Sequence, residues 1–325
     1  MKQQEFEQRH QSTWEQLEAI VAATRKKQRE PDVYNQLPTH YRQLCHQLAI
    51  AKHRRYSPTL VNRLNNLVLA CHNIIYAQST RFRYQWLRFF LADFPRALYV
   101  NRRYVWLSVL LFVGPGLLLG ILCFNNHNLI YSVMDWDQVR NMEEMYNPDN
   151  RILGRERQAD SDLQMFGYYI WNNIGIAFRT FASGILFGIG TLFLIIYNGV
   201  VIGAVAGHLT QLGYIETFYP FVVGHGSFEL TALILSGAAG LKIGMVLLSP
   251  GPFTRGAALR FAARDVVQIL LGAAAMLLVA AFIEAFWSSK GSLPLSVKYS
   301  VGALLWTIVL AYLYYFARRN SGGSE

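Results

Sequence analysis

The segment H-G-S-F-E contains the strongest candidate for chemistry in an otherwise apolar stretch. His225 and Glu229 are four residues apart, so both side chains project to one face if Gly224 and Gly226 permit a turn that opens into a helix. The two side chains can share a proton, bind a divalent metal ion together, or simply form a hydrogen bond with each other. Hydrocarbon penalises a central charge by about 2.5–3.5 kcal/mol on insertion scales, so each group needs a partner, water or a function.

A zinc site would require three or four nitrogen, oxygen or sulfur ligands. His208 and Glu216 are candidate ligands beside His225 and Glu229, but the sequence has no H-E-x-x-H and no paired C-x-x-C motif. The pattern therefore favours a structural or proton-sensitive pair over a metal site, and contact with a lipid or partner headgroup stays open. We expect no cofactor.

Glu284 is a second carboxylate within an apolar segment. It lies one turn from the end of that segment, beside Trp287. It either snorkels outward or completes a buried carboxylate pair with Glu229, and the spacing is compatible with both arrangements.

Polar groups also interrupt other apolar segments. Asn198, in Y-N-G-V-V-I-G, can donate and accept, and we expect an interhelical hydrogen bond rather than a ligand contact. Asn172 and Asn173 could pair with Asn198 or with Glu229, and Arg179 closes the same segment.

Composition predicts an all-α polytopic membrane protein. Hydrophobic residues make up 53% of the 325 residues and charged residues 15%, outside the averages for soluble domains. A spanning helix needs about 20 mostly apolar residues. Four stretches clearly meet this requirement: 104–123, 184–207, 267–287 and 297–316. A fifth, 228–248, meets it less cleanly because it contains two charged residues.

Charge bias predicts the number of crossings. Cytoplasmic loops carry an excess of Lys and Arg, as the C-terminus and the loop at 250–265 do. Residues 1–30 are polar and contain no signal peptide, so we expect the N-terminus in the cytoplasm as well. Two termini on one side require an even number, which favours six spans with the sixth at 162–178. The alternative is five spans plus an interfacial or re-entrant helix there.

The net charge of +10 arises in the first third of the chain, where residues 1–103 contain 17 Lys and Arg against 7 Asp and Glu. Such charge suits either nucleic acid or anionic headgroups, which attract each basic residue by about 1 kcal/mol. The charge peaks immediately before the first span, so we expect membrane lipids rather than nucleic acid. The expected membrane-surface residues are Arg81, Arg83, Arg88, Arg96, Arg102 and Arg103.

Residues 1–100 have the periodicity of a small basic cytoplasmic helical domain. The first helix, around Trp14, is polar enough to project as an arm, and Ser57-Pro58 is a good start for another helix. Residues 84–99 read as an elbow helix on the inner leaflet. Residues 101–320 form the predicted transmembrane domain, which includes an external acidic loop at 125–161 that we expect to be a partly ordered cap.

Several long motifs resemble the stage II sporulation protein M family of integral membrane proteins. They are YSPTLVNRLNNLVLACHNIIY, WNNIGIAFRTFASGILFGIGTLFLIIYNGVVIGAVAGH, GHGSFELTALILSGAAGLKIG and IEAFW, within residues 57–290. The resemblance implies a bacterial cytoplasmic (inner) membrane protein and, as partners, envelope or peptidoglycan-remodelling proteins, with a MoxR-type ATPase and an RDD-family membrane protein as gene neighbours.

Three functions are compatible with these features. The leading expectation is a non-catalytic scaffold or assembly factor for an envelope complex. The second is a transporter or channel for an ion, lipid or hydrophobic cargo, and the third is an intramembrane metal-dependent hydrolase. Glycines at four-residue spacing, such as Gly199, Gly203 and Gly207, predict close helix packing, either within the chain or in a homodimer.

Overall fold

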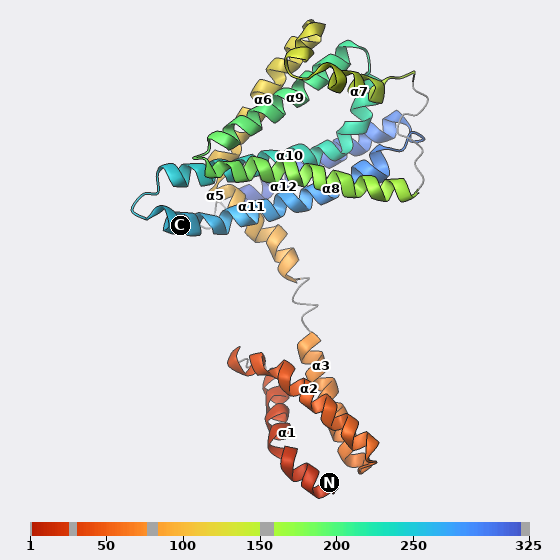
Figure 1. Ribbon diagram of the computed structural model, residues 1–325, viewed down its shortest axis with the longest axis vertical. Coiled ribbons are helices and arrows are strands. Elements are labelled where there is room, and N and C mark those ends of the chain that lie inside the picture. The colour runs from red at the N-terminus through yellow and green to blue at the C-terminus, as the bar shows by residue number, and fades with distance from the viewer. Residues whose placement is uncertain (1, 26–30, 77–83, 150–158, 320–325) are drawn as a thin grey trace. The chain divides into compact units, whose positions relative to one another are not determined.

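The computed structural model describes all residues except 1, 26–30, 77–83, 150–158 and 320–325 (Figure 1). Every regular element among the described residues is helical, which confirms the predicted all-α fold. The chain divides into two compact units, Met1–Arg88 and Phe89–Glu325. Arg81 and Arg83, two of the expected membrane-surface residues, lie outside the described residues.

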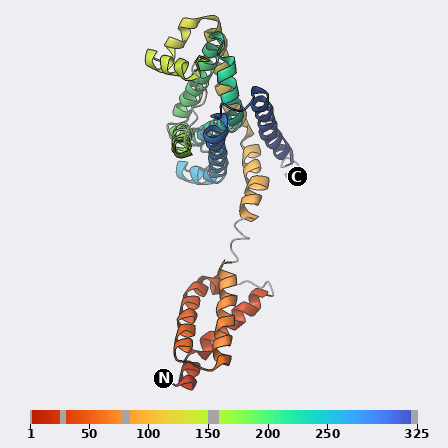
Figure 2. The same cartoon turned by 90° about the vertical axis from the view of Figure 1, so that its right-hand side faces the viewer.

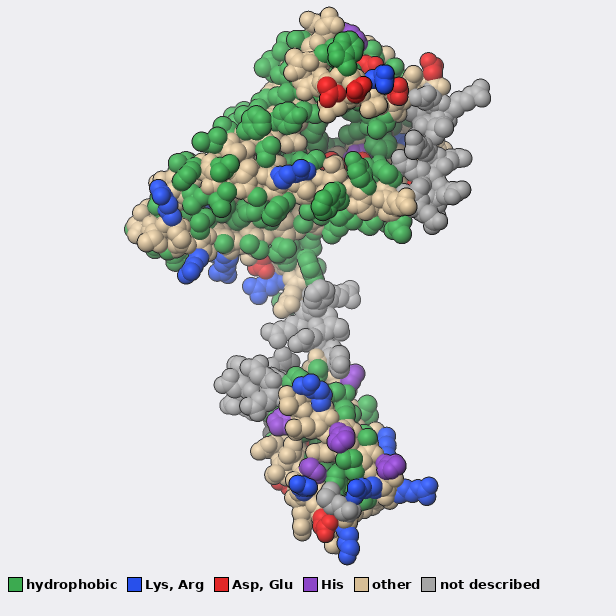
Figure 3. Space-filling model, in the orientation of Figure 1, with side chains coloured by type: hydrophobic (Ala, Val, Ile, Leu, Met, Phe, Trp, Pro, Cys, Tyr) green, Lys and Arg blue, Asp and Glu red, His purple; other side chains and the backbone are tan. Residues whose placement is uncertain are grey.

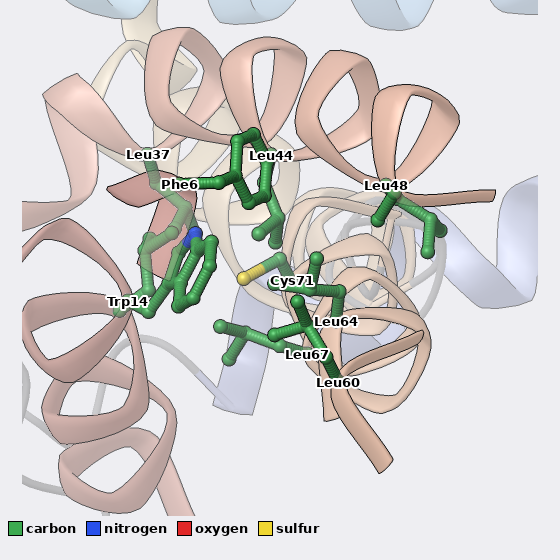
Figure 4. Packing of buried hydrophobic residues seen from close by; sticks show 11 residues of the cluster. Phe6, Trp14, Leu37, Leu44, Leu48, Leu60, Leu64, Leu67 and Cys71 are labelled. Atoms are coloured by element: carbon green, nitrogen blue, oxygen red, sulfur yellow. The ribbon is translucent and has the colours of Figure 1, made fainter. Parts of the chain in front are cut away.

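The described residues of the first unit include three long helices, α1 Gln3–Arg25, α2 Pro31–His53 and α3 Pro58–Tyr76. They pack against one another as a small bundle (Figure 2). Their apolar faces enclose one core, whose largest fully buried side chains are Trp14 and Phe6 of α1 (Figure 4). The expectation that this first helix projects as an arm is therefore wrong, because α1 supplies the aromatic half of the core.

Polar contacts fix α1 against the other two helices. Ser57 caps α3 as predicted, since the Leu60 amide donates to Ser57 Oγ at 3.4 Å. The Ser57 amide in turn donates to Gln3 Oε1 at 3.0 Å. Inside the core the Trp14 indole donates to Gln47 Oε1 at 2.7 Å. These bonds, of which the one between Trp14 and Gln47 is buried, help to specify one arrangement of the three helices.

The expected elbow at 84–99 is divided between the two units. Residues 84–88 are helical and belong to the first unit, whereas a π-helical turn at Phe89–Asp93 and helix α5 Phe94–Val100 belong to the second. Phe94 is 1% exposed and packs against α11 and α12. The second unit therefore begins before residue 100, because the aromatic side chains of this segment are part of its core.

Five described helices of the second unit are long and apolar enough to cross a membrane. Large apolar side chains on their outer faces are exposed, for example Trp106 at 69% and Leu110 at 65%, as expected of surfaces that contact lipid. Figure 3 shows this predominantly hydrophobic surface. The five are α6 Arg102–Asn125, α9 Ile189–Gln211, α10 Ile215–Leu248, α11 Arg255–Ile283 with its continuation to Ser288, and α12 Leu295–Arg319.

Helix α8, Ala159–Ala182, is a sixth long helix of this unit. Asn172, Asn173 and Arg179 lower its hydropathy, so it is not among the five. It packs against α10 and α11 and runs alongside them in Figure 1. Residues 162–178, where the sequence predicts a sixth crossing, therefore lie within one continuous helix that packs in the bundle.

Glycines join α6 to α9. Gly116 and Gly120 of α6 face Gly199, Gly203 and Gly207 of α9 so closely that a Cβ on Gly203 would collide with the Gly116 carbonyl. Small residues at four-residue spacing allow this backbone approach in membranes. The glycine pattern therefore predicts the packing correctly, and for these positions the partner is a helix of the same chain.

The loop at 125–161, which we predict to be external, forms an ordered cap over its described residues. It contains a 3₁₀ turn at His127–Ser132 and helix α7 Trp136–Tyr146, which begins with a capping box between Asp135 and Gln138. Ile130 is fully buried against residues that include Ala204 of α9. Acidic side chains gather on the outside of the cap (Figure 3).

Replacing Gly203 by Ala should force α6 and α9 apart. Overpacking of this kind costs about 1–3 kcal/mol, so thermal unfolding of the detergent-solubilised protein should begin at a lower temperature. Gly114→Ala, on α6 where nothing lies within 4 Å of the added Cβ, is the matched control and should leave the midpoint unchanged or slightly higher. Equal thermal unfolding midpoints for the two variants would contradict the close contact between the glycines of α6 and those of α9.

Replacing Trp14 by Ala should unfold the first unit selectively. Removing a buried Trp costs about 3–5 kcal/mol, which is measurable as faster proteolysis within residues 1–76 of the full-length protein at moderate urea. Leu69 of α3 is 53% exposed, so Leu69→Ala should change stability by less than about 0.5 kcal/mol. A Trp14→Ala chain as resistant as wild type would show that α1 does not close this core.

Candidate functional site

His225 and Glu229 lie one turn apart on α10, as their spacing predicts. The helix continues through both neighbouring glycines, so the expected turn before the helix is wrong. Gly224 instead permits a close approach, because a Cβ there would lie 2.9 Å from the Trp287 ring. His225 is 6% exposed and Glu229 is partly buried.

Glu284 joins this pair from the end of α11. It begins a π-helical turn, Glu284–Ser288, and is 8% exposed. One ligand atom from each of His225, Glu229 and Glu284 lies within 4.8 Å of the other two. Glu284 therefore does not snorkel outward but lies buried beside Glu229, which is the second of the two arrangements that its position in the sequence allowed. Wider turns of this kind are frequent at functional sites because they redirect a side chain within a helix.

A chain of polar contacts supports the cluster from the α12 side. His225 Nδ1 lies 3.1 Å from Ser288 Oγ, and the buried Lys298 of α12 donates to the Ser288 carbonyl at 3.0 Å. Phe221 packs edge-on against the His225 ring with centroids 5.4 Å apart. The imidazole is therefore held in position by both a hydroxyl and an aromatic ring.

Tyr146, at the end of the cap helix α7, faces the same cluster. Burial raises the pKa of its phenol, and the negative charges of Glu284 and Glu229 raise it further. Thr217 of α10 donates to the Tyr146 carbonyl at 2.6 Å. Sequence spacing could not identify Tyr146, because it is 79 residues from His225 and lies in a loop with little apolar periodicity.

The predicted asparagines do not join the cluster. Asn198 donates to the Leu194 carbonyl of its own helix at 2.7 Å, so the expected interhelical hydrogen bond is wrong. Asn172 donates to Asn173 at 3.0 Å rather than pairing with Asn198 or Glu229. An amide that satisfies itself locally needs no partner across the bundle.

His208 belongs to a different contact. It is fully buried, with its Nε2 2.7 Å from Glu143 Oε1 of the cap, and its ring stacks on His127 at 4.8 Å. It therefore links α9 to the cap instead of joining His225 as a metal ligand. The other proposed ligand, Glu216, is exposed.

The remaining predicted basic residues lie away from the cluster. Arg179 is exposed and donates to the Gly175 carbonyl of α8 at 3.0 Å. Arg102 is exposed and its guanidinium lies over the Tyr99 ring at 4.6 Å. Arg88, Arg96 and Arg103 are exposed too. Exposure at these positions is compatible with the headgroup contacts expected of them.

The arrangement brings two carboxylates and an imidazole together within a bundle of apolar helices. Two carboxylates at this distance repel each other strongly where water is scarce, so a proton or a cation must offset their charge. The cluster can therefore hold a proton or bind a cation. Bond-breaking chemistry would also require access for water and a substrate.

Comparisons with known proteins agree with the division into two units. Residues 108–289, more than half of the chain, match the family model for stage II sporulation protein M. Residues 4–77 match a domain of unknown function (DUF8413). An uncharacterized protein of Methanocaldococcus jannaschii is 28% identical over 132 residues, which cover 38% of this chain and 71% of that protein. No solved structure matches the chain.

Replacing Gly224 by Ala should disturb the cluster by pushing Trp287 and the π-helical turn away from α10. The expected cost is about 1–3 kcal/mol, measured as a lower thermal midpoint in detergent. Gly226→Ala, two residues away, meets only a Val222 methyl at 3.4 Å and should be tolerated. Equal effects of the two substitutions would contradict the close contact with Trp287.

Proposed function

The chain belongs to the stage II sporulation protein M family, and on this premise we propose that it is a membrane scaffold for an envelope complex. In this role the helices of Phe89–Glu325 anchor the protein in the bilayer. The unit Met1–Arg88 then serves as the docking module for partner proteins.

The observation that carries this proposal is the separate core of the first unit. The five candidate spans all lie in the second unit, whereas α1, α2 and α3 enclose their own core around Trp14. Over residues 1–88, Lys and Arg outnumber Asp and Glu by 14 to 6. A folded module with a basic surface suits acidic protein partners and anionic headgroups.

Burial of the polar cluster favours a scaffold over a transporter or a hydrolase. A transported ion or a hydrolytic water must reach the reacting groups. The side chains of His225 and Glu284 are only 6% and 8% exposed. The cluster is thus better suited to holding helices together than to turnover.

The proposed location is the bacterial cytoplasmic membrane, with both termini in the cytoplasm. The acidic cap supports this orientation, because basic segments are retained inside and acidic loops are tolerated outside. Helix α8 supports it as well, since six long helices would return the C-terminus to the side of the N-terminus.

The proposed partners follow from the family resemblance. They are envelope or peptidoglycan-remodelling proteins, with a MoxR-type ATPase and an RDD-family membrane protein as further candidates. A unit with its own hydrophobic core can bind such partners without rearranging the membrane helices.

Removing the first unit should abolish partner binding and leave membrane insertion intact. The measurement is cross-linking and co-purification from native membranes at natural expression, comparing the full-length chain with one lacking residues 2–83. In a matched control, an unrelated soluble domain of similar size replaces residues 2–83. We expect specific envelope proteins with the full-length chain and none with either altered chain.

Two outcomes would contradict the scaffold. One is an absence of specific partners for the full-length chain, and the other is the same set of partners after the first unit is replaced. Flux of an ion or lipid across reconstituted vesicles that Glu229→Gln abolishes would instead support the transport alternative.

A further inference from the structure

We propose that His225, Glu229 and Glu284 form a binding site for one divalent transition-metal cation, of the class of Zn²⁺, Mn²⁺ or Fe²⁺. The cation would join α10 to the π-helical turn that follows α11. This site is independent of the docking role proposed for the first unit.

The first support is distance. The three ligand atoms lie within 4.8 Å of one another. Metal bonds to imidazole nitrogen and carboxylate oxygen are about 2.0–2.2 Å long, so two ligands of one ion are at most about 4.4 Å apart. Small side-chain rotations would therefore close the cluster around a cation, with no change in the helices.

The second support is the ligand set. One imidazole with two carboxylates suits Zn, Mn and Fe better than a soft, thiolate-preferring ion. Three protein ligands also leave a coordination position open for a further group. The ligands come from two helices, so binding would cross-link elements that are 55 residues apart, from Glu229 to Glu284.

The third support is the group that orients the histidine. His225 Nδ1 lies 3.1 Å from Ser288 Oγ, which leaves Nε2 available as a ligand atom. A hydrogen bond on one ring nitrogen is the usual way in which a metal-binding histidine is held in the correct tautomer and plane. Ser288 belongs to the same π-helical turn as Glu284, so one local distortion positions a ligand and its supporting group.

Charge gives the fourth support. Two carboxylates that are brought together in an apolar bundle carry a large desolvation and repulsion cost. A divalent cation offsets both charges at once. A single protonated histidine can offset only one of them.

The test begins with the full-length protein purified in detergent without chelator. Elemental analysis should find about one transition-metal ion per chain. Removal with a chelator should lower the thermal midpoint, and addition of Zn²⁺ or Mn²⁺ should restore it. Glu229→Gln and Glu284→Gln should each weaken binding by more than the 10–100-fold loss typical of outer-shell partners, whereas Ser288→Ala should fall within about that range. Glu216→Gln, an exposed change on the same helix, should bind as wild type does.

Several results would overturn the proposal. One is wild-type protein that contains clearly substoichiometric metal and shows no shift in midpoint when Zn²⁺, Mn²⁺ or Fe²⁺ is added. Another is equal metal retention by Glu229→Gln, which would place the ion elsewhere. A third is a metal-free protein that Glu284→Gln stabilises, which would identify a proton shared by the carboxylates. The wild-type titration remains decisive even if a variant fails to fold.

Discussion

A bilayer penalises every polar group that lacks a partner, and much of the second unit follows from this constraint. Small polar side chains meet it by donating to backbone carbonyls: Ser108 to Ile234 across helices at 2.7 Å, and Thr191 to Thr180 at 2.6 Å. Charged side chains cannot be satisfied so simply. Their compensation requires groups from several elements, and the cluster around His225 combines α10, the end of α11, α12 and the cap.

Lipid also removes the hydrophobic force that drives helices together in water, so close packing must replace it. The glycine contacts between α6 and α9 serve this purpose, and Gly184 meets Gly240 of α10 in the same way. In the first unit the hydrophobic effect stabilises the packing instead, because water favours burial of Trp14 and its apolar neighbours in a core. Two solvents thus produce two modules, and the membrane helices and the first unit, which we propose to be a docking module, have separate cores in one chain.

Local features of the sequence predicted much of this architecture. Apolar length identified the five candidate spans, and the position of α8 was anticipated from charge parity. Ser57-Pro58 marked the start of α3, and the four-residue spacing placed His225 and Glu229 on one face. Except for charge parity, which compares the two termini and the loop at 250–265, each of these features depends on residues within a few turns of one another, where helix geometry alone relates sequence to position.

Tertiary structure decided the features that depend on how one helix is rotated against another. Glu284 meets Glu229, Tyr146 faces both, and His208 turns to Glu143 of the cap. Spacing along the chain left the pair of Glu284 and Glu229 as one of two arrangements and did not indicate the other two contacts, because each joins different elements and depends on the rotation of each helix about its axis. That rotation is set by packing over the whole bundle, down to the glycine at which Trp287 approaches α10.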